Sequence, residues 1–302
     1  MQEVLDTITV PVYAAALGAL WIIEGLMPAF EGWREARGQR ARHLLLAAIN
    51  GGVGAAMALA VAGVIVVCER SGFGLLRWMP VHPAFSFVIA FLVLDLTQYA
   101  MHIAAHKMPL LWRLHSVHHN ATRMEATAAM RFHTIEVCFT CLAPIPVIAL
   151  FGFNLPQVLL YHLVLMPVAM FHHADLRMPP ALDRWIRWVI VTPRMHWIHH
   201  SRWQPETDSN YSAVLSIWDR LFGTMRSRRH AESVDFGLDG FTDEDTETLR
   251  GWFLSPFGER KAGLGEKPPS HLLVPDEPEA DASAAERDAA RHAAPASATM
   301  RG

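Results

Sequence analysis

The chain has 302 residues, of which 52% are hydrophobic and 18% are charged, and its mean hydropathy is +0.18. A soluble domain usually carries about 25% charged residues, so this composition favours a membrane protein. The net charge of −3 and the lack of a long basic run give no reason to expect nucleic acid as a partner. Three cysteines are too few for a disulfide framework.

Five apolar stretches are long enough, or nearly so, to cross a hydrocarbon layer of about 30 Å. They lie at about residues 8–30, 44–68, 84–105, 135–152 and 157–173. The first lacks the basic region and cleavage site of a secretory signal, so we expect it to remain as a membrane helix. The last two are nearly adjacent, which predicts a helical hairpin at 135–173. The predicted fold class is therefore an all-α integral membrane protein, with a helix bundle and a helical cap.

Basic residues concentrate on one side of this arrangement. The 31–43 and 106–133 loops each carry four of them, whereas the opposite side has only Arg70 and Arg77. Basic loops usually remain in the cytoplasm. Five crossings then place the N-terminus outside and the segments 106–133 and 174–260 in the cytoplasm, as expected for a protein of a bacterial inner membrane.

The chain divides into three predicted parts. Residues 1–83 hold the N-terminal membrane helices, and residues 84–260 hold the histidine-rich motifs. Residues 261–302 are rich in Pro, Ala, Asp, Glu and Ser. This last part lacks the apolar content that would offset the entropy cost of ordering, so we expect a disordered tail.

Eight of the 17 histidines fall into three boxes. These are an H-x3-H at His102 and His106, an H-x2-H-H at His115, His118 and His119, and a second H-x2-H-H at His196, His199 and His200. Spacings of three and four residues put side chains on one face of a helix. By chance an H-x3-H is expected about once and an H-x2-H-H only about 0.05 times, so the two H-x2-H-H copies indicate a function.

Eight imidazoles exceed the four ligands that satisfy a structural zinc ion, which favours two metal ions. Imidazole suits iron, copper, nickel and zinc alike, so the ligand type does not identify the metal. An oxidoreductase, a membrane zinc hydrolase and a non-catalytic metal-binding protein are the alternatives. A hydrolase of this kind would carry an H-E-x-x-H motif, which is absent. A transporter would place its ligands near the membrane midplane, whereas these boxes lie at or beyond helix ends.

Five segments between residues 85 and 260 carry more specific motifs. They are DLTQYAMHIAAHKMPLLWRLHSVHHN (95–120), MRFHTIE (130–136), FHHADLRMP (171–179), TPRMHWIHHS (192–201) and DSNYSAVLSIWDRLFGT (208–224). Together they resemble the sterol desaturase/fatty acid hydroxylase superfamily of membrane-bound, histidine-box di-iron oxygenases. The resemblance implies that residues 84–260 form a fatty acid hydroxylase-like domain. Its implied function is hydroxylation or desaturation of a lipid or other hydrophobic substrate, with two iron ions and O2.

The resemblance also implies the metal ligands. They are His102, His106, His115, His118, His119, His173, His196, His199 and His200, with His133 as a further candidate. Zinc in a purified sample would not argue against iron, because bound metal reflects availability. No heme-binding H-P-G-G motif is present, so the implied electron donor is a separate ferredoxin, cytochrome b5-type protein or reductase. Ile103, Asp175 and Ser212 depart from the residues common in the family, but none of them is a box histidine.

Three acidic residues are candidates for orienting ligand imidazoles. Asp95 shares a helix face with His102 and lies deeper in the predicted third membrane helix. Because an intramembrane acid is costly and usually faces the protein interior, we expect Asp95 to pair with a histidine, His173 first of all. Glu136 and Asp208 are weaker candidates for the same role.

The remaining histidines have weaker signals. His162 lies on the face of His173 but deeper, which makes it a candidate ligand or substrate-channel residue. His172 points about 100° away from His173, so at most one of these two should bind metal, and the resemblance favours His173. Thr192 and Pro193 predict the start of a helix that carries the third box. The others are interpreted as surface or tail residues: His43, His82, His230, His271 and His292.

Overall fold

The structure is a computed structural model that describes residues 2–30, 37–258, 265, 267–269 and 272–273. The predicted tail, 261–302, therefore lies almost wholly outside the described residues. Helices dominate the described part, whose extended pairing is limited to three isolated bridges. The all-α fold predicted from the hydropathy pattern is confirmed.

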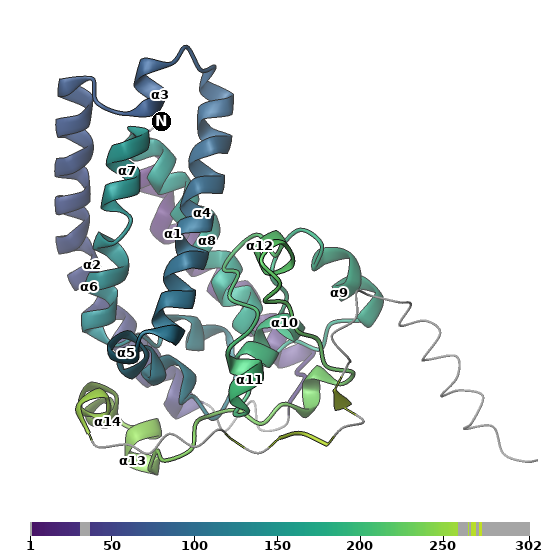
Figure 1. The fold of residues 1–302 in the computed structure, drawn as a ribbon. Helices are drawn as coiled ribbons and strands as arrows, with labels where there is room; N and C mark the ends of the chain where they lie inside the picture. Colours follow the sequence, from purple (N-terminus) through teal and green to yellow (C-terminus); the bar gives the residue numbers. More distant parts are fainter. Residues whose placement is uncertain (1, 31–36, 259–264, 266, 270–271, 274–302) are drawn as a thin grey trace, which may run out of the picture.

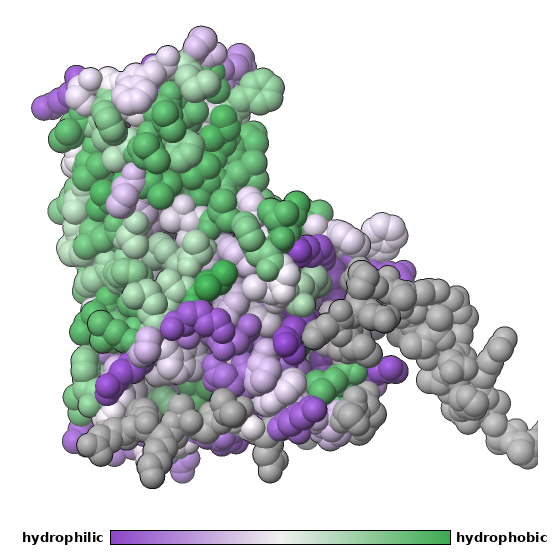
Figure 2. Space-filling model, viewed as in Figure 1, coloured by the Kyte–Doolittle hydropathy of each residue, from purple (hydrophilic) through white to green (hydrophobic). Residues whose placement is uncertain are grey.

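Within the described residues, five segments are long and apolar enough to cross a membrane, as predicted. They are Thr7–Leu26 in α1 (Gln2–Leu26), Gly38–Trp78 in α2 (Arg37–Ser71) and α3 (Leu75–Trp78), Pro83–Lys107, which is α4, Thr134–Phe151 in α6 (Thr134–Leu142) and α7 (Ile145–Phe151), and Leu155–His173, which is α8. Figure 1 shows them as an elongated bundle, and Figure 2 shows that hydrophobic residues cover its visible face. Such a surface suits contact with lipid.

The predicted hairpin at 135–173 is formed by α6, α7 and α8. Proline residues Pro144 and Pro146 lie at the break between α6 and α7. Asn154 caps α8, because its side chain accepts from the Gln157 N–H while the Gln157 side chain accepts from the Asn154 N–H. These reciprocal bonds satisfy donors that the first helical turn leaves free.

Two chain reversals meet at the end of the bundle where α3 lies (Figure 1). A Cβ atom on Gly74 would lie 2.3 Å from the Cα atom of Gly152. Both residues also have positive φ angles, 131° and 72°. Glycine is required at this contact because any side chain would separate the two backbones.

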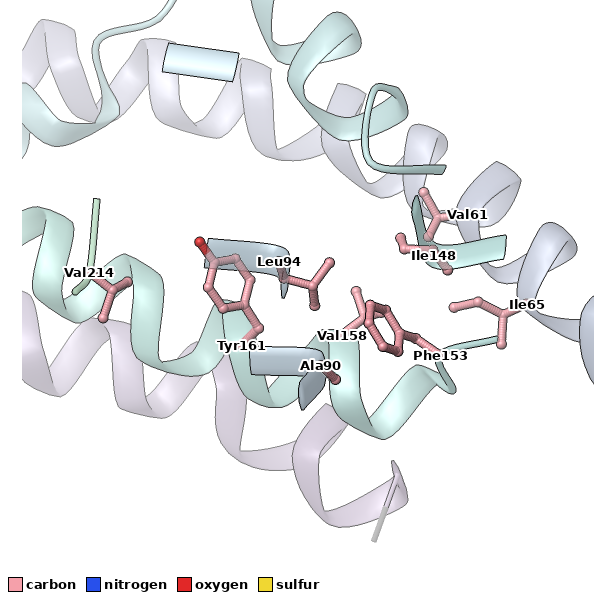
Figure 3. Close-up of a cluster of buried hydrophobic side chains, with 9 residues drawn as sticks. All are labelled: Val61, Ile65, Ala90, Leu94, Ile148, Phe153, Val158, Tyr161 and Val214. Carbon is pink, nitrogen blue, oxygen red and sulfur yellow. The ribbon is translucent and has the colours of Figure 1, made fainter. Parts of the chain in front are cut away.

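The bundle core also includes a residue from the cap. Figure 3 shows the buried cluster of Val61, Ile65, Ala90, Leu94, Ile148, Phe153, Val158, Tyr161 and Val214. Eight of these come from α2, α4, the α7–α8 hairpin and its turn, whereas Val214 belongs to the cap. The cap therefore packs directly against the membrane-spanning helices.

The cap consists of short helices at the opposite end of the bundle from α3 (Figure 1). Its elements are α5 (Pro109–His119), η1 (Ala126–Met130), α9 (Pro180–Ile186), α10 (Pro193–His199), α11 (Gln204–Thr207), α12 (Ile217–Leu221), η2 (Ala231–Ser233), α13 (Asp243–Glu247), α14 (Leu249–Leu254) and η3 (Ser255–Phe257). The cap combines the two predicted polar segments, 106–133 and 174–260, at one end of the bundle.

Buried polar contacts hold the first two helices against this cap. On α1, Glu24 accepts hydrogen bonds from the backbone N–H groups of Ala126 and Asp175, at 2.7 and 2.9 Å. On α2, His43 Nδ1 lies 2.9 Å from a Glu125 carboxylate oxygen. The interpretation of His43 as a surface residue is therefore wrong, since its side chain is fully buried in this network.

Candidate metal centre

The three histidine boxes and His173 converge on two adjacent groups of side chains. The five-histidine group contains His102, His106, His115, His119 and His199, and the four-histidine group contains His118, His173, His196 and His200. Within each group the candidate ligand atoms lie within 4.8 Å of one another. The structure thus brings together all nine histidines expected as ligands.

Each H-x2-H-H box is divided between the two groups. On α5, His115 and His119 join the five-histidine group, whereas His118 joins the other. On α10 the division is reversed, because His196 and His200 join the four-histidine group and His199 the other. Residues four apart share a helix face, so the outer pair of each box points to one group and the middle histidine to its neighbour.

The start of α10 follows the predicted pattern, with Pro193 in its first turn. The Thr192 hydroxyl, however, makes no capping hydrogen bond. Among the described residues, Asn210 alone has a positive φ without being glycine, at 50°. Its side chain donates to the carbonyls of Met195 and Arg226 at 2.9 and 3.0 Å, which fixes the 208–212 segment against α10.

The 208–212 segment supplies backbone carbonyl groups to the five-histidine group. The Nδ1 atom of His102 lies 2.7 Å from the Tyr211 carbonyl, and that of His199 lies 2.7 Å from the Ser209 carbonyl. A proton on each Nδ1 leaves the Nε2 lone pair for a metal ion. The sequence does not reveal these carbonyl groups, because every residue has one. The D-S-N-Y motif at 208–211, which contains Asn210, is the one sequence signal in this segment.

Two carboxylates also lie beside this group, at positions that the sequence singled out. Glu136 Oε1 lies 2.6 Å from His115 Nδ1, a hydrogen-bonding distance. Asp208 Oδ1 lies 3.4 Å from His106 Nδ1, which is an ion-pair distance without hydrogen-bond geometry. Asp208 is shared with Lys107, whose ammonium donates to it at 2.8 Å.

The four-histidine group has fewer polar supports. His173 Nδ1 lies 2.7 Å from the Ala169 carbonyl of its own helix. The Nδ1 atoms of His118, His196 and His200 are buried and have no hydrogen-bond partner in the part of the chain that the structure describes. His118 instead stacks on Phe132, with ring centroids 4.4 Å apart and planes at 12°. Packing therefore orients much of this group.

The donor atoms fit metal ions. The Nε2 atom of His173 lies 3.1 Å from that of His118 and 2.9 Å from that of His196. Burial, followed by the neighbouring imidazoles, lowers the pKa of five box histidines of the cap well below 6.5: His118, His119, His196, His199 and His200. These neutral rings present lone pairs to one another at close range, an arrangement that a shared cation stabilises.

Comparison with known proteins identifies the family to which the chain belongs. The family described as fatty acid hydroxylase matches residues 87–224, which include all nine histidines, Glu136 and Asp208. The ornithine lipid hydroxylase OlsE of Rhizobium tropici is 31% identical over 92% of this chain and 84% of its own length. The chain belongs to the fatty acid hydroxylase family.

Other relatives of this family match about half of the chain. The alkylglycerol monooxygenase of Xenopus tropicalis is 30% identical over 50% of this chain and 32% of its own length. The cholesterol 25-hydroxylase of Rattus norvegicus is 24% identical over 52% of each. No solved structure matches the chain. The relatives are lipid hydroxylases and monooxygenases, which supports an oxidoreductase that acts on a lipid.

The departures from common fatty acid hydroxylase residues make structural contacts. Asp175 accepts hydrogen bonds from the backbone N–H groups of Ala29 and Phe30, at 2.7 and 2.9 Å, and so holds the segment after α1. The Ser212 N–H donates to Asp219 at 3.0 Å within the cap. Ile103 is half-buried on α4. None of the three contributes a donor atom to either histidine group.

The expected pairing of Asp95 with His173 is wrong. Asp95 accepts hydrogen bonds from the Tyr161 hydroxyl, the Leu215 N–H and the Trp218 Nε1–H, at 3.2, 3.0 and 2.8 Å. His173 Nδ1 is directed to the Ala169 carbonyl instead. Asp95 therefore joins α4 and α8 to the cap. Helix spacing correctly predicted that Asp95 points inward, but it could not show which element would lie opposite.

Three other candidate histidines lie outside both groups. His133 caps α6, with Nδ1 accepting from the Ile135 N–H at 3.1 Å and Nε2 3.3 Å from the Phe253 carbonyl. His162 is exposed on α8. His172 is buried, with its ring centroid 3.9 Å from that of His196. Of the His172–His173 pair, only His173 contributes to a histidine group, in agreement with the helix geometry.

Proposed function

We propose that this protein hydroxylates a membrane lipid with O2 at a pair of iron ions held by nine histidines. The observation that carries this proposal is the division of the histidines into two adjacent groups, each rich enough in donors for one metal ion. Membership of the fatty acid hydroxylase family supports iron over the other metals that imidazole binds.

The two ions would have different numbers of histidine ligands. His102, His106, His115, His119 and His199 would bind one ion, and His118, His173, His196 and His200 the other. When bound, the metal pair supplies the redox chemistry that activates O2. Glu136 and the carbonyls of Ser209 and Tyr211 would keep the imidazoles of His115, His199 and His102 in the tautomer that presents Nε2. Asp208 would place a negative charge beside His106.

The reaction needs an external reductant. Conversion of a C–H bond to C–OH by O2 consumes two electrons and two protons and releases one water molecule. We propose that a separate ferredoxin, cytochrome b5-type protein or reductase delivers these electrons. Removal of a second hydrogen would give desaturation, but the hydroxylase and monooxygenase names of the relatives favour hydroxylation.

The substrate is proposed from a relative that matches 92% of the chain. Because that protein is an ornithine lipid hydroxylase, ornithine lipids are the first substrates to assay. The apolar surface of the bundle would let such a lipid approach from the bilayer (Figure 2). No contact in the described residues favours a zinc hydrolase or a non-catalytic metal-binding protein over this lipid hydroxylase.

Isotope labelling tests this function directly. The purified protein is reconstituted with iron in liposomes that contain ornithine lipid and is supplied with a reductant under 18O2. The product should gain the mass of one 18O atom, and His199→Ala should form none. Product that carries oxygen from water, or turnover without O2, would contradict the proposal.

We further propose that the cap faces the cytoplasm of a bacterium, as the basic loops predict. Single cysteines at Thr122 and Ser227 lie in the two cap segments and should react with an impermeant thiol reagent from the cytoplasmic side only. Reaction of the two sites from opposite sides of the membrane would contradict this topology.

A further inference from the structure

Outside the candidate membrane spans, the cap carries a cluster of exposed apolar side chains. We define the α9–α12 surface as Leu182, Trp185, Trp188, Val189, Ile217 and Leu221, whose exposed fractions range from 49% to 71%. Two contacts join its halves, since the Ser216 hydroxyl donates to the Arg187 carbonyl and the Arg220 guanidinium lies 4.5 Å from the Trp188 ring centroid. In Figure 2 hydrophobic side chains lie over α12, close to the bundle. The two halves of the surface therefore lie side by side.

The exposed charged side chains of the two segments that carry this surface are of one sign. The acidic residues of the flanking segments 177–189 and 213–223 are Asp183 and Asp219, and both are buried, at 2% and 0% exposure. Asp183 pairs with Arg187, and Asp219 accepts from the Tyr211 and Ser212 N–H groups. Arg177 and Arg184 are exposed. Tryptophan beside arginine, with no exposed acid in these two segments, suits the interfacial region of an anionic bilayer.

The position of α12 along the bundle determines how deep the α9–α12 surface lies relative to the bilayer. Asp95 lies at the middle of α4 and accepts hydrogen bonds from the Leu215 N–H and the Trp218 Nε1–H, so α12 adjoins the midpoint of a membrane-spanning helix. Figure 1 likewise shows α12 beside α4, above the end of the bundle where α5 lies. If the α9–α12 surface were in water, only Pro83–Leu94, about 18 Å of helix, would remain to cross the bilayer. A hydrocarbon layer is about 30 Å thick.

We infer that the α9–α12 surface is embedded in the membrane leaflet on the side of the cap. Its occupant is lipid: the apolar side chains contact acyl chains, while Arg177 and Arg184 reach phosphate groups. The surface adjoins α4, a candidate membrane span that must itself contact the bilayer. The cap is then a partly submerged domain rather than one that rests above the membrane.

Spin labelling tests this depth in the full-length protein in liposomes. Cys138 and Cys141 are replaced by alanine and Cys68 is left, because its side chain is buried. Nitroxides are placed at Trp185→Cys and Leu221→Cys. Val88→Cys, 55% exposed on α4, serves as the lipid-facing reference. Arg250→Cys, whose side chain is 75% exposed, serves as the water-facing reference. Each label is assayed for collision with O2, which enters the bilayer, and with a nickel chelate that stays in water.

The labels at 185 and 221 should have the high ratio of O2 to nickel collision seen at 88, and each variant should keep its metal content. A ratio like that at 250 would overturn the inference, since the surface would then face water. Low collision with both reagents would also overturn it, because a second copy of the chain or another protein would then cover the surface. A nitroxide at Leu182→Cys gives an independent position on α9 if either variant fails to fold.

Discussion

The two histidine groups share their burial but differ in what lies behind the rings. In the five-histidine group, Glu136 and Asp208 lie beside two imidazoles, and the backbone carbonyls of Ser209 and Tyr211 lie beside two more. In the four-histidine group, His173 alone has a hydrogen-bonded Nδ1 among the described residues, and its partner is a neutral carbonyl. The carboxylates therefore belong to one group only.

This difference predicts two unequal metal sites. A carboxylate that accepts from Nδ1 raises the basicity of the imidazole and fixes its orientation. Negative charge close to the five-histidine group should also favour the more highly charged state of its metal ion. The four-histidine group, oriented largely by packing, should bind its ion more weakly.

Removal of one ligand from each group should give the largest effect. His118→Ala and His199→Ala should both abolish O2-dependent turnover, because the reaction needs both ions, and both should leave membrane insertion intact. His118→Ala leaves three donors in its group whereas His199→Ala leaves four, so His118→Ala should retain less metal. Elemental analysis of the purified variants checks this order. Full metal content together with full turnover would remove the residue from the proposed ligand set.

Both histidine groups should make the stability of the folded protein sensitive to acid. The pKa of His199 and His200 is lowered by burial, so the folded apoprotein keeps both neutral while the unfolded chain binds protons below about pH 6.5. The free energy of unfolding should therefore fall as the pH drops below about 6.5, by up to about 1.4 kcal/mol per pH unit for each such histidine.

Chelator-treated protein, unfolded by denaturant between pH 7.5 and 5.5, provides the measurement. His199→Gln and His200→Gln should each reduce the dependence on pH by a similar amount. A reduction in only one of the two variants would show that burial does not act equally on both groups.

Replacement of Glu136 isolates the carboxylate contribution. Glu136→Gln keeps the size of the side chain but removes the charge beside His115. Loss of such a partner typically lowers metal affinity or activity about 10–100-fold. Competition with a metal-binding dye should show weaker binding of one ion and unchanged binding of the other.

Asp95→Asn is the matched control, since Asp95 is also a buried carboxylate but contacts Tyr161, Leu215 and Trp218 rather than a ligand. It should leave metal affinity unchanged and lower the free energy of unfolding by about 1–3 kcal/mol, as for a buried hydrogen-bond partner that is lost. Equal metal loss in both variants would contradict a specific role for Glu136.

The smallest effect is expected at Asp208. Its carboxylate lies 3.4 Å from His106, is partly exposed and is shared with Lys107. Exposed ion pairs contribute about 0.2–1 kcal/mol, so Asp208→Asn should weaken metal binding by no more than about fivefold. The effect should decrease at high salt, where such pairs are screened. A loss as large as that of Glu136→Gln would mean that the two carboxylates support their imidazoles equally.

The sequence by itself determined the membrane helices and the histidines that meet. Hydropathy and length predict a spanning helix locally, so all five were found, and the i, i+4 spacing of His115 with His119 already places both rings on one face. Glu136 was a candidate for orienting a ligand imidazole, but the sequence could not show that its partner would be His115.

Only the tertiary structure decided which histidine joins which group. A spacing fixes the direction of a side chain relative to its own helix, whereas its partner depends on how the helices are placed around it. The reversed division of the α5 and α10 boxes, the cap contact of Asp95 and the burial of His43 all arise in this way. No sequence motif could have predicted the role of the Ser209 and Tyr211 carbonyls, because every residue has a carbonyl and the fold alone determines where it points.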